Sequence, residues 1–346
     1  MNVFEISKTA AGGYAGSLLA ALAPPELDAP VVTRLVLDDV QFESPGGECF
    51  LHHGKAELQP SSPRKATAEH IHLDPYRVLI EDVGPAELRS LGWTYTALKT
   101  AYPNLIIISL SAFGLSGAYS DWLGNDFLAQ AVGGVMHATG YAGEAPVGLP
   151  GEAAFMIAGL HGATAALAAT YGDGSGMHID ISAQDTYMQH WTRHVAEYAY
   201  SSVTTTRAPR SPEGLHYVHT ARAKDGWLYL LALREPWQDL AAFLGLGELL
   251  PSDAFNDSAD AESAQQPPWV ELEQAFHDAV ASKSKYQWFA EAADLGWTFA
   301  PVEDPFEIAA SPQVEARGGM LRVPVQDSEG TSELLMPPLP WLDTSD

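Results

Sequence analysis

Residues 104–114, NLIIISLSAFG, form an unbroken apolar run that ends in a Phe-Gly turn. Such a run is typical of a strand buried on both faces of a parallel sheet, because a half-exposed strand would alternate with polar residues. Similar runs, VFEIS, RLVLDD and YRVLIED, come earlier, and segments with helical spacing alternate with them. This alternation predicts a doubly wound α/β domain, which binds ligands at the carboxyl ends of its strands.

The second half of the chain indicates a smaller domain. A segment rich in Ser, Thr, Pro and Arg, residues 201–214, is typical of a linker. Beyond it, Lys224-Asp225-Gly226 lies between two β-rich runs and predicts a hairpin, with helical segments following. We therefore expect a large α/β domain formed by residues 1–205 and 301–346, with a small α+β domain, residues 213–300, inserted between its two parts.

Charge limits the partners that this chain can bind. It has 18 Lys and Arg residues against 44 Asp and Glu residues, a formal net charge of −26. Such a surface disfavours nucleic acid and anionic membranes. Between Thr100 and Thr192 there is no Lys or Arg at all. An anion bound by that stretch would therefore depend on backbone N–H groups and helix N-termini.

Other patterns argue against a membrane, a metal or a disulfide. We find no run of 18 or more apolar residues and no basic-then-apolar leader, which predicts no membrane association. The single cysteine, Cys49, fits a reducing cytoplasm. Of the 12 histidines, His190 and His194 are the best-spaced pair, yet they lack the glutamate of a zinc-protease motif. We therefore expect a cytoplasmic protein without a metal.

Seven segments together carry a family resemblance. In this order they resemble the class III CoA-transferases, which include formyl-CoA transferase, carnitine CoA-transferase and α-methylacyl-CoA racemase: AGGYAGSLLAAL, FLHHGKAEL, LRSLGWTYTALKTAYPNLIIISLSAFGLSGAYSD, GNDFLAQAVGGVM, SGMHIDIS, KDGWLYL and APVEDPFEIAASPQVEARG. The resemblance extends over about residues 3–340. Its most specific part is the strand with its SxFGxxGxY pattern, followed by GxDxxxQAxxG.

The resemblance implies a CoA-binding large domain, an inserted small domain and an interlocked dimer. It also implies transfer of CoA from an acyl-CoA to a free carboxylate through a covalent intermediate on one Asp, a case of nucleophilic catalysis. In the family this Asp stands four residues before a Gly. Here the matching Gly is Gly159, and Phe155 stands four residues before it. A one-residue shift of the alignment offers Ala154, so neither alignment supplies a nucleophile.

Other family positions are partly kept and partly replaced. Lys55 matches a basic CoA contact, and the resemblance also assigns Asp126 and Gln130 to the CoA site. The arginine that meets the CoA phosphates in the family is replaced by Gly84. Where the racemase has a proton-transfer histidine, this chain has Asn125, which argues against racemase chemistry.

Three interpretations follow for function. The sequence favours a catalytically silent member, acting as a scaffold or as one subunit of a homodimer or of a heterodimer with an active homologue. An active transferase would need a displaced nucleophile, and Glu152 is the nearby carboxylate, although its charge would equally stabilise a helix N-terminus. A third interpretation is another acyl-CoA activity on the same fold, such as a lyase or hydratase.

Overall fold

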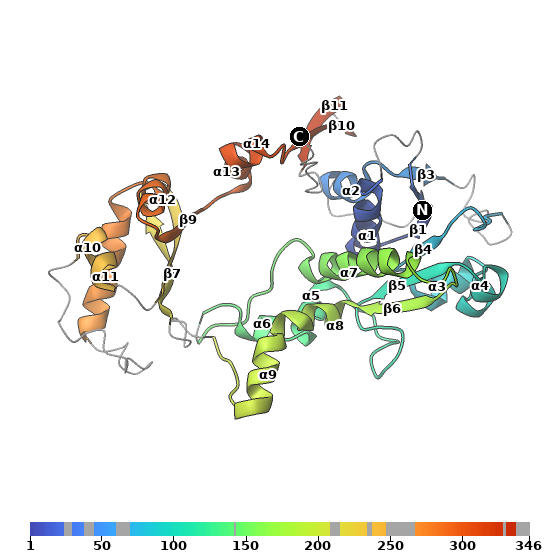
Figure 1. The fold of residues 1–346 in the computed structure, drawn as a ribbon, viewed down its shortest axis with the longest axis horizontal. Coiled ribbons are helices and arrows are strands. Elements are labelled where there is room, and N and C mark those ends of the chain that lie inside the picture. The colour runs from blue at the N-terminus through green and yellow to red at the C-terminus, as the bar shows by residue number, and fades with distance from the viewer. Residues whose placement is uncertain are drawn as a thin grey trace. The chain divides into compact units, whose positions relative to one another are not determined.

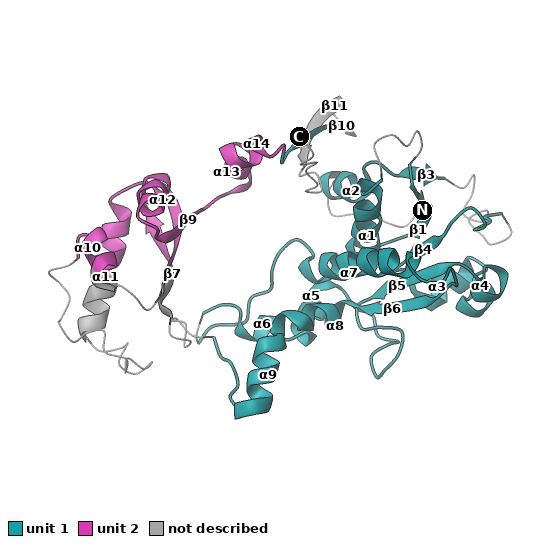
Figure 2. Ribbon diagram, viewed as in Figure 1, with its two compact units in different colours: residues 1–207, 319–346 teal, residues 208–318 magenta. Residues whose placement is uncertain are grey.

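The computed structural model describes residues 1–23, 30–37, 45–59, 70–141, 143–207, 215–233, 237–246, 267–327 and 330–336 (Figure 1). The chain divides into two compact units (Figure 2). Unit 1 comprises residues 1–207 and 319–346, and unit 2 comprises residues 208–318. Each unit contains buried hydrophobic residues that pack into a core of its own, as expected of separate domains.

Unit 1 is built on a six-stranded parallel sheet with the order β3-β2-β1-β4-β5-β6. The strands are β1 (Val3–Ile6), β2 (Val32–Leu35), β3 (Ala56–Leu58), β4 (Val78–Glu81), β5 (Ile106–Ser111) and β6 (His178–Ser182). The predicted parallel α/β sheet is thus confirmed. The strand order reverses between β1 and β4, and open α/β sheets bind their ligands at such a switch point.

The helices of unit 1 lie mostly between successive strands of this sheet. They are α1 (Ala10–Ala21), α2 (Pro45–His52), α3 (Gly84–Ser90), α4 (Tyr95–Ala101), α5 (Asp126–Val132), α6 (Val135–Ala138), α7 (Ala153–Thr170), α8 (Ala183–Met188), the 3₁₀ helix η2 (Gln189–Trp191) and α9 (Thr192–Ser201). An antiparallel hairpin, β10 (Leu321–Asp327) with β11 (Gly330–Met336), completes the described part of the unit.

Both faces of the sheet are buried, which explains the unbroken apolar run of β5. Ile106 and Ile108 pack with α1 and α7 in one hydrophobic cluster. Ile107, between them, packs in a second cluster with Leu88 of α3 and Leu98 of α4. Each strand residue therefore enters a core whichever way it points.

Helices α1 and α7 approach each other closely because their contact is made by small residues. A Cβ atom on Gly159 of α7 would lie 2.5 Å from the Ala11 carbonyl oxygen of α1. On the other side of α1, a Cβ atom on Gly16 would lie 1.8 Å from a carboxylate oxygen of Glu5. Glycine is thus needed at both positions for α1 to pack between α7 and the sheet.

Helix α7 corrects one expectation from the sequence. Its 18 residues have a mean hydropathy of 1.4, so by length and composition the helix could cross a membrane. From the sequence we expected no apolar run of this length. The helix owes this value to its alanines and stays partly inside the protein, with 44% of it buried. It packs against α1 and β5, as a core helix does.

Unit 2 combines a three-stranded antiparallel sheet with helices. Strands β7 (Leu215–Ala223) and β8 (Gly226–Leu233) form the hairpin predicted around Lys224-Asp225-Gly226, and β9 (Thr298–Val302) pairs with β8. The helices are α10 (Trp237–Phe243), α11 (Pro267–Ala281), α12 (Lys285–Asp294), α13 (Pro305–Ala309) and α14 (Pro312–Ala316). Leu228, Phe276 and Trp288 belong to the core of this unit.

Unit 2 ends later than we expected from the sequence. The expected return to the large domain at residue 301 falls inside β9, which is paired with β8. The buried Lys285 ammonium then binds the Val302 carbonyl at 2.9 Å and the Glu307 carboxylate at 2.6 Å, holding the following turn to α12. The unit therefore continues to Gly318. The expected start at residue 213 lies outside the described residues.

We predict that Gly16→Ala lowers the free energy of unfolding by about 1–3 kcal/mol, because the added Cβ would overlap the Glu5 carboxylate. An ordinary helix would instead gain about 0.5–1 kcal/mol from this substitution. Urea-induced unfolding measures the difference. Ala20→Gly in the same helix is the control for helix propensity, and a Gly16→Ala variant more stable than the wild type would contradict the packing.

Candidate functional site

At the β1–β4 switch point, where open α/β sheets have a ligand-binding crevice, this chain has a carboxylate of its own. Asp82, which follows β4, accepts hydrogen bonds from the backbone N–H groups of Lys8 at 2.6 Å and Gly12 at 2.9 Å. It also accepts from the N–H of Thr9 at 3.1 Å and from its hydroxyl at 2.6 Å. Burial raises the pKa of Asp82 to about 7 despite these four donors. The N-terminus of α1, a natural anion site, thus already holds a carboxyl group.

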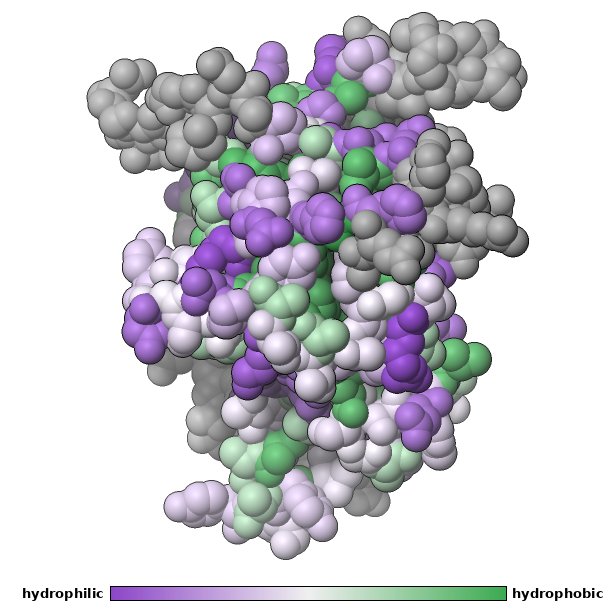
Figure 3. Space-filling model, turned by 90° about the vertical axis from the view of Figure 1, so that its right-hand side faces the viewer, coloured by the Kyte–Doolittle hydropathy of each residue, from purple (hydrophilic) through white to green (hydrophobic). Residues whose placement is uncertain are grey.

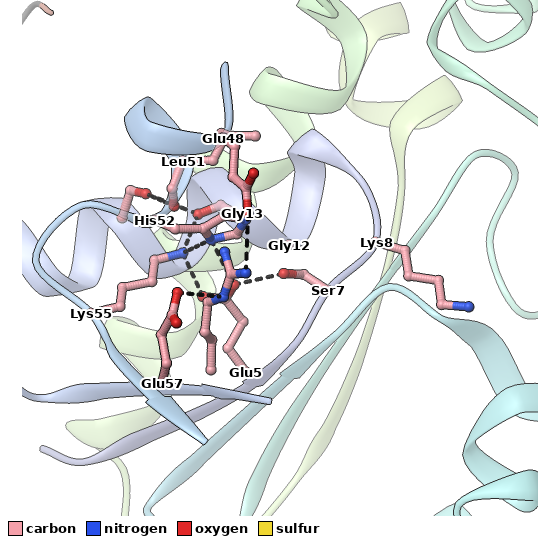
Figure 4. A network of polar contacts seen from close by, with 12 residues as sticks. Glu5, Ser7, Lys8, Gly12, Gly13, Glu48, Leu51, His52, Lys55 and Glu57 are labelled. Atoms are coloured by element: carbon pink, nitrogen blue, oxygen red, sulfur yellow. Dashed lines mark hydrogen bonds and ion pairs between the residues drawn. The ribbon is translucent and has the colours of Figure 1, made fainter. Parts of the chain in front are cut away.

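Lys55 lies in a buried polar cluster next to this switch point (Figure 4). Its ammonium group donates to the Glu5 carboxylate and to the Gly13 carbonyl, both at 2.7 Å, and its side chain is fully buried. Glu5 also accepts a 2.6 Å hydrogen bond from the Ser7 hydroxyl. Burial lowers the pKa of Lys55, while the adjacent Glu5 carboxylate opposes this shift. In this arrangement Lys55 neutralises a carboxylate inside the core.

Two further basic side chains surround the pair. The Nδ1 atom of His52 lies 3.3 Å from the Lys55 ammonium, and burial together with the charges of Lys55 and Arg34 lowers the pKa of His52 to about 2. His52 is therefore neutral and accepts a hydrogen bond from Lys55. Arg34 lies 3.5 Å from each of two carboxylates, those of Glu48 and Glu57. The cluster joins β1, β2, α1 and α2; the charged groups of Glu5, Lys55 and Arg34 have little access to water, whereas Glu48 and Glu57 are about half exposed.

Asp126 and Gln130 come together at the N-terminus of α7. Asp126 accepts the backbone N–H of Phe155 at 2.9 Å and the side-chain amide of Gln130 at 2.6 Å. Gln130 also bonds both the N–H and the carbonyl of Leu149, at 2.8 and 2.9 Å. The GxDxxxQ segment thus fixes the chain before α7 and its first turn. A direct role of Asp126 and Gln130 in CoA binding stays a prediction.

Phe155 and Glu152 occupy different environments at this helix end. The side chain of Phe155 is buried in the core that α7 shares with the sheet. Glu152 precedes the first helical residue, is exposed and has φ 57°, in the left-handed region that a residue with a Cβ seldom adopts. The side chain of Glu152 makes no capping hydrogen bond to α7. Phe155 and Glu152 thus both lie at the N-terminus of α7, with the Glu152 carboxylate on the solvent side.

The two replaced family positions have local structural roles. Gly84 is the first residue of α3, has φ 79° and donates its N–H to the Glu81 carboxylate at 3.0 Å. Asn125 is the N-cap of α5, since its side-chain oxygen accepts the N–H of Leu128 at 2.9 Å. Lys55 belongs to the separate cluster around Glu5, on the α1 and α2 side of the sheet.

Sequence reasoning missed two carboxylates near the switch point, those of Glu5 and Asp82. Glu5 lies in the middle of a buried strand, VFEIS, and a charged residue in such a run signals a buried partner. Asp82 directly follows β4, where a ligand-binding residue would be expected. Its actual partners, three backbone N–H groups and the Thr9 hydroxyl, lie 70 to 74 residues earlier in the chain, and backbone N–H groups leave no signal in the sequence.

Comparisons with known proteins agree with this fold. The model of CoA-transferase family III matches residues 77–344, so the chain belongs to this family. It is 22% identical to succinate–glutarate CoA-transferase of Agrobacterium fabrum, over 96% of this chain and 86% of that protein. Against human succinyl-CoA:glutarate CoA-transferase, 24% identity covers 70% of this chain and 55% of that protein. A CAIB/BAIF family protein from Brucella suis shares the fold, with a TM-score of 0.82 and 23% identity over 100% and 92% of the two chains.

We predict that Lys55→Met lowers the free energy of unfolding by about 3–5 kcal/mol, because it leaves the Glu5 carboxylate buried without its counter-ion. Chemical unfolding of the two proteins gives the difference. The matched control is Lys283→Met, which removes an exposed ion pair with Glu291 and should cost at most about 1 kcal/mol. Equal costs for the two variants would show that the buried pair contributes no more than an exposed one.

Proposed function

We propose that this chain is a non-catalytic member of CoA-transferase family III, acting as a subunit or scaffold. The observation that carries the proposal is Phe155, which lies where the resemblance places the nucleophilic Asp. Its ring is 6% exposed, and its backbone N–H donates to Asp126. A benzyl side chain has no lone pair with which to attack a thioester, and a bonded N–H is not free to stabilise an oxyanion.

The charges around the site support the same proposal. CoA carries about four negative charges near neutral pH, from its phosphates. Gly84 replaces the phosphate-binding Arg, and the ammonium of Lys55 is occupied by Glu5 and Gly13. Asp82 adds a carboxyl group at the anion-binding end of α1. CoA or an acyl-CoA, if bound, would therefore bind more weakly than in a relative that keeps these cations.

The strongest test restores the nucleophile. We predict that Phe155→Asp forms a hydroxylamine-sensitive CoA adduct when it is incubated with succinyl-CoA, the donor suggested by the names of the relatives, whereas the wild type forms none. Mass spectrometry of the intact protein detects the adduct. Met156→Asp, which adds a carboxylate one residue further along α7, is the control for charge and folding. A wild-type protein that transfers CoA to glutarate would contradict the proposal.

A second candidate is an active transferase that uses Glu152. Two observations favour it: the carboxylate is exposed at the N-terminus of α7, and its residue keeps a backbone conformation that costs about 1 kcal/mol or more for a non-glycine residue. Unusual backbone conformations of this kind occur at functional sites. Under this alternative, wild-type transfer would be present and Glu152→Gln, which keeps the side-chain shape, would abolish it.

We further propose that the chain functions as a dimer, either with itself or with a family member that retains the Asp. Several large apolar side chains of unit 1 are exposed: Trp122, Leu123, Phe127, Tyr198 and Tyr200. Hydrophobic residues also lie between hydrophilic ones on the face drawn in Figure 3. Exposed apolar surface supports contact with a second chain. The cytoplasmic location stays a prediction.

We predict that the purified protein has twice the mass of one chain in solution. Light scattering after size-exclusion chromatography measures this mass. Tyr200→Lys should shift the distribution toward single chains if α9 contributes to the contact, and Tyr171→Lys, at another exposed tyrosine, is the control. Mixing with a tagged homologue that carries the Asp then distinguishes a mixed dimer from a homodimer. A monomer under both conditions would overturn the dimer proposal.

A further inference from the structure

Four polar side chains connect the surface of β6 with a buried carboxylate at the end of β4. Glu81, the last residue of β4, is fully buried and accepts the hydroxyl of Tyr95 at 2.8 Å. The Ser109 hydroxyl of β5 donates to the Tyr95 oxygen at 3.4 Å and lies 2.8 Å from the Nε2 atom of His178. His178 is the first residue of β6 and is exposed. The series therefore runs from solvent to the interior across three neighbouring strands (Figure 1).

The order of the strands brings these side chains to one face of the sheet. Glu81 is paired with Ser109 in the β4–β5 register, and Ser109 with Asp180 in the β5–β6 register. His178 lies two residues before Asp180 and so points to the same face. The Tyr95 ring, at the start of α4, lies over the His178 ring with 4.2 Å between the ring centres. Packing thus fixes Tyr95 and His178 beside the intervening hydroxyl of Ser109.

The hydrogen bonds have one consistent direction. Tyr95 donates to Glu81 and Ser109 donates to Tyr95, so the remaining contact requires the Nε2–H of His178 to donate to Ser109. Every proton then points toward the Glu81 carboxylate. A chain of this kind can pass a proton from end to end, provided that the Ser109–Tyr95 contact shortens from 3.4 Å during the transfer.

We propose that His178, Ser109, Tyr95 and Glu81 form a proton relay that exchanges protons between solvent and the buried Glu81 carboxylate. A proton binds Nδ1 of His178, which passes its Nε2 proton to Ser109. Ser109 passes its own proton to Tyr95, and Tyr95 passes its proton to Glu81. The imidazolium and the carboxylate become a neutral imidazole and a neutral carboxylic acid, so protons and charge balance.

The groups around the relay are consistent with this exchange. Burial raises the pKa of Glu81, and the hydrogen bonds that its carboxylate accepts from the Tyr95 hydroxyl and the Gly84 N–H oppose this shift, so its protonated form becomes accessible. Burial lowers the pKa of His178, with Asp180 on the same strand opposing the shift and Lys99 of α4 adding to it. Burial and the Glu81 charge raise the pKa of Tyr95, which therefore carries a proton to pass on. This proposal does not depend on the proposed function.

The relay places a change of charge beside the switch point. Glu81 directly precedes Asp82, which holds the β1–α1 turn, and its second carboxylate oxygen binds the N–H of Gly84 at the start of α3. Protonation of Glu81 weakens its attraction for that N–H, because a neutral carboxyl is a poorer acceptor than a carboxylate. The relay thus transmits a protonation event at the surface to the first turn of α3.

The experiment follows the protonation of Glu81 by time-resolved infrared spectroscopy after a rapid drop in pH. The protonated-carboxyl band of Glu81 is identified by its loss in Glu81→Gln. We predict that His178→Gln, an exposed substitution that keeps a hydrogen-bond partner for Ser109, slows the appearance of this band by on the order of 100-fold. Ser109→Ala should slow it similarly, because the central hydroxyl is lost.

Tyr102→Phe is the matched control. It removes a tyrosine hydroxyl next to the end of α4 that accepts the Leu73 N–H and is not part of the relay, so the wild-type rate is expected. Circular dichroism verifies that each variant is folded. The proposal is overturned if His178→Gln and Ser109→Ala both protonate Glu81 at the wild-type rate, or if no carboxyl band is lost in Glu81→Gln.

Discussion

The ion pair between Glu5 and Lys55 is the contact on which the arrangement of α1 depends. Its two charges are buried beside the hydrophobic cluster that α1 forms with the sheet, and Gly16 is required so that α1 can approach them. A buried charge of this kind is tolerated only with its partner, because desolvation of either ion alone costs several kcal/mol. A lysine that the resemblance assigns to a ligand thus serves the packing of β1, α1 and α2. A phosphate group could bind Lys55 only if the ion pair between Lys55 and Glu5 were broken.

The N-terminus of α7 keeps the bonds of the GxDxxxQ motif, and Phe155 stands at the position that the resemblance assigns to the nucleophile. Asp126 and Gln130 fix the backbone from Leu149 to Phe155 whatever side chain residue 155 carries, since their bonds go to main-chain atoms and to each other. Such a backbone would orient an aspartate at that position. With phenylalanine there, the same bonds hold an apolar ring in the core. A match to the motif therefore accounts for the local backbone, which does not depend on the side chain at position 155.

The sequence predicted what depends on local pattern and missed what depends on distant pairing. The strand at residues 106–111 and the hairpin after Ala223 were predictable, because periodicity and turn residues determine them locally. The end of unit 2 was placed too early, since it depends on the contacts that Lys285 makes with Val302 and Glu307 beyond the expected boundary. Of the candidate site, the assignment of Phe155 to the nucleophile position stays a prediction from spacing. The burial of Lys55 was not predictable from the sequence, because Glu5 lies 50 residues away.

The buried carboxylates on the two faces of the sheet have different kinds of partner. On the α1 side, Glu5 is paired with the Lys55 ammonium group at 2.7 Å, and this contact fixes its position. On the α4 side, Glu81 accepts hydrogen bonds from the neutral Tyr95 hydroxyl and Gly84 N–H, which hold a carboxylate less strongly than an ammonium group does. A hydrogen-bonded chain that ends on an exposed histidine then gives that carboxylate a path to solvent. The fold thus combines a fixed charge with an exchangeable one on either side of the β1–β4 switch point, and only the second can respond to its surroundings.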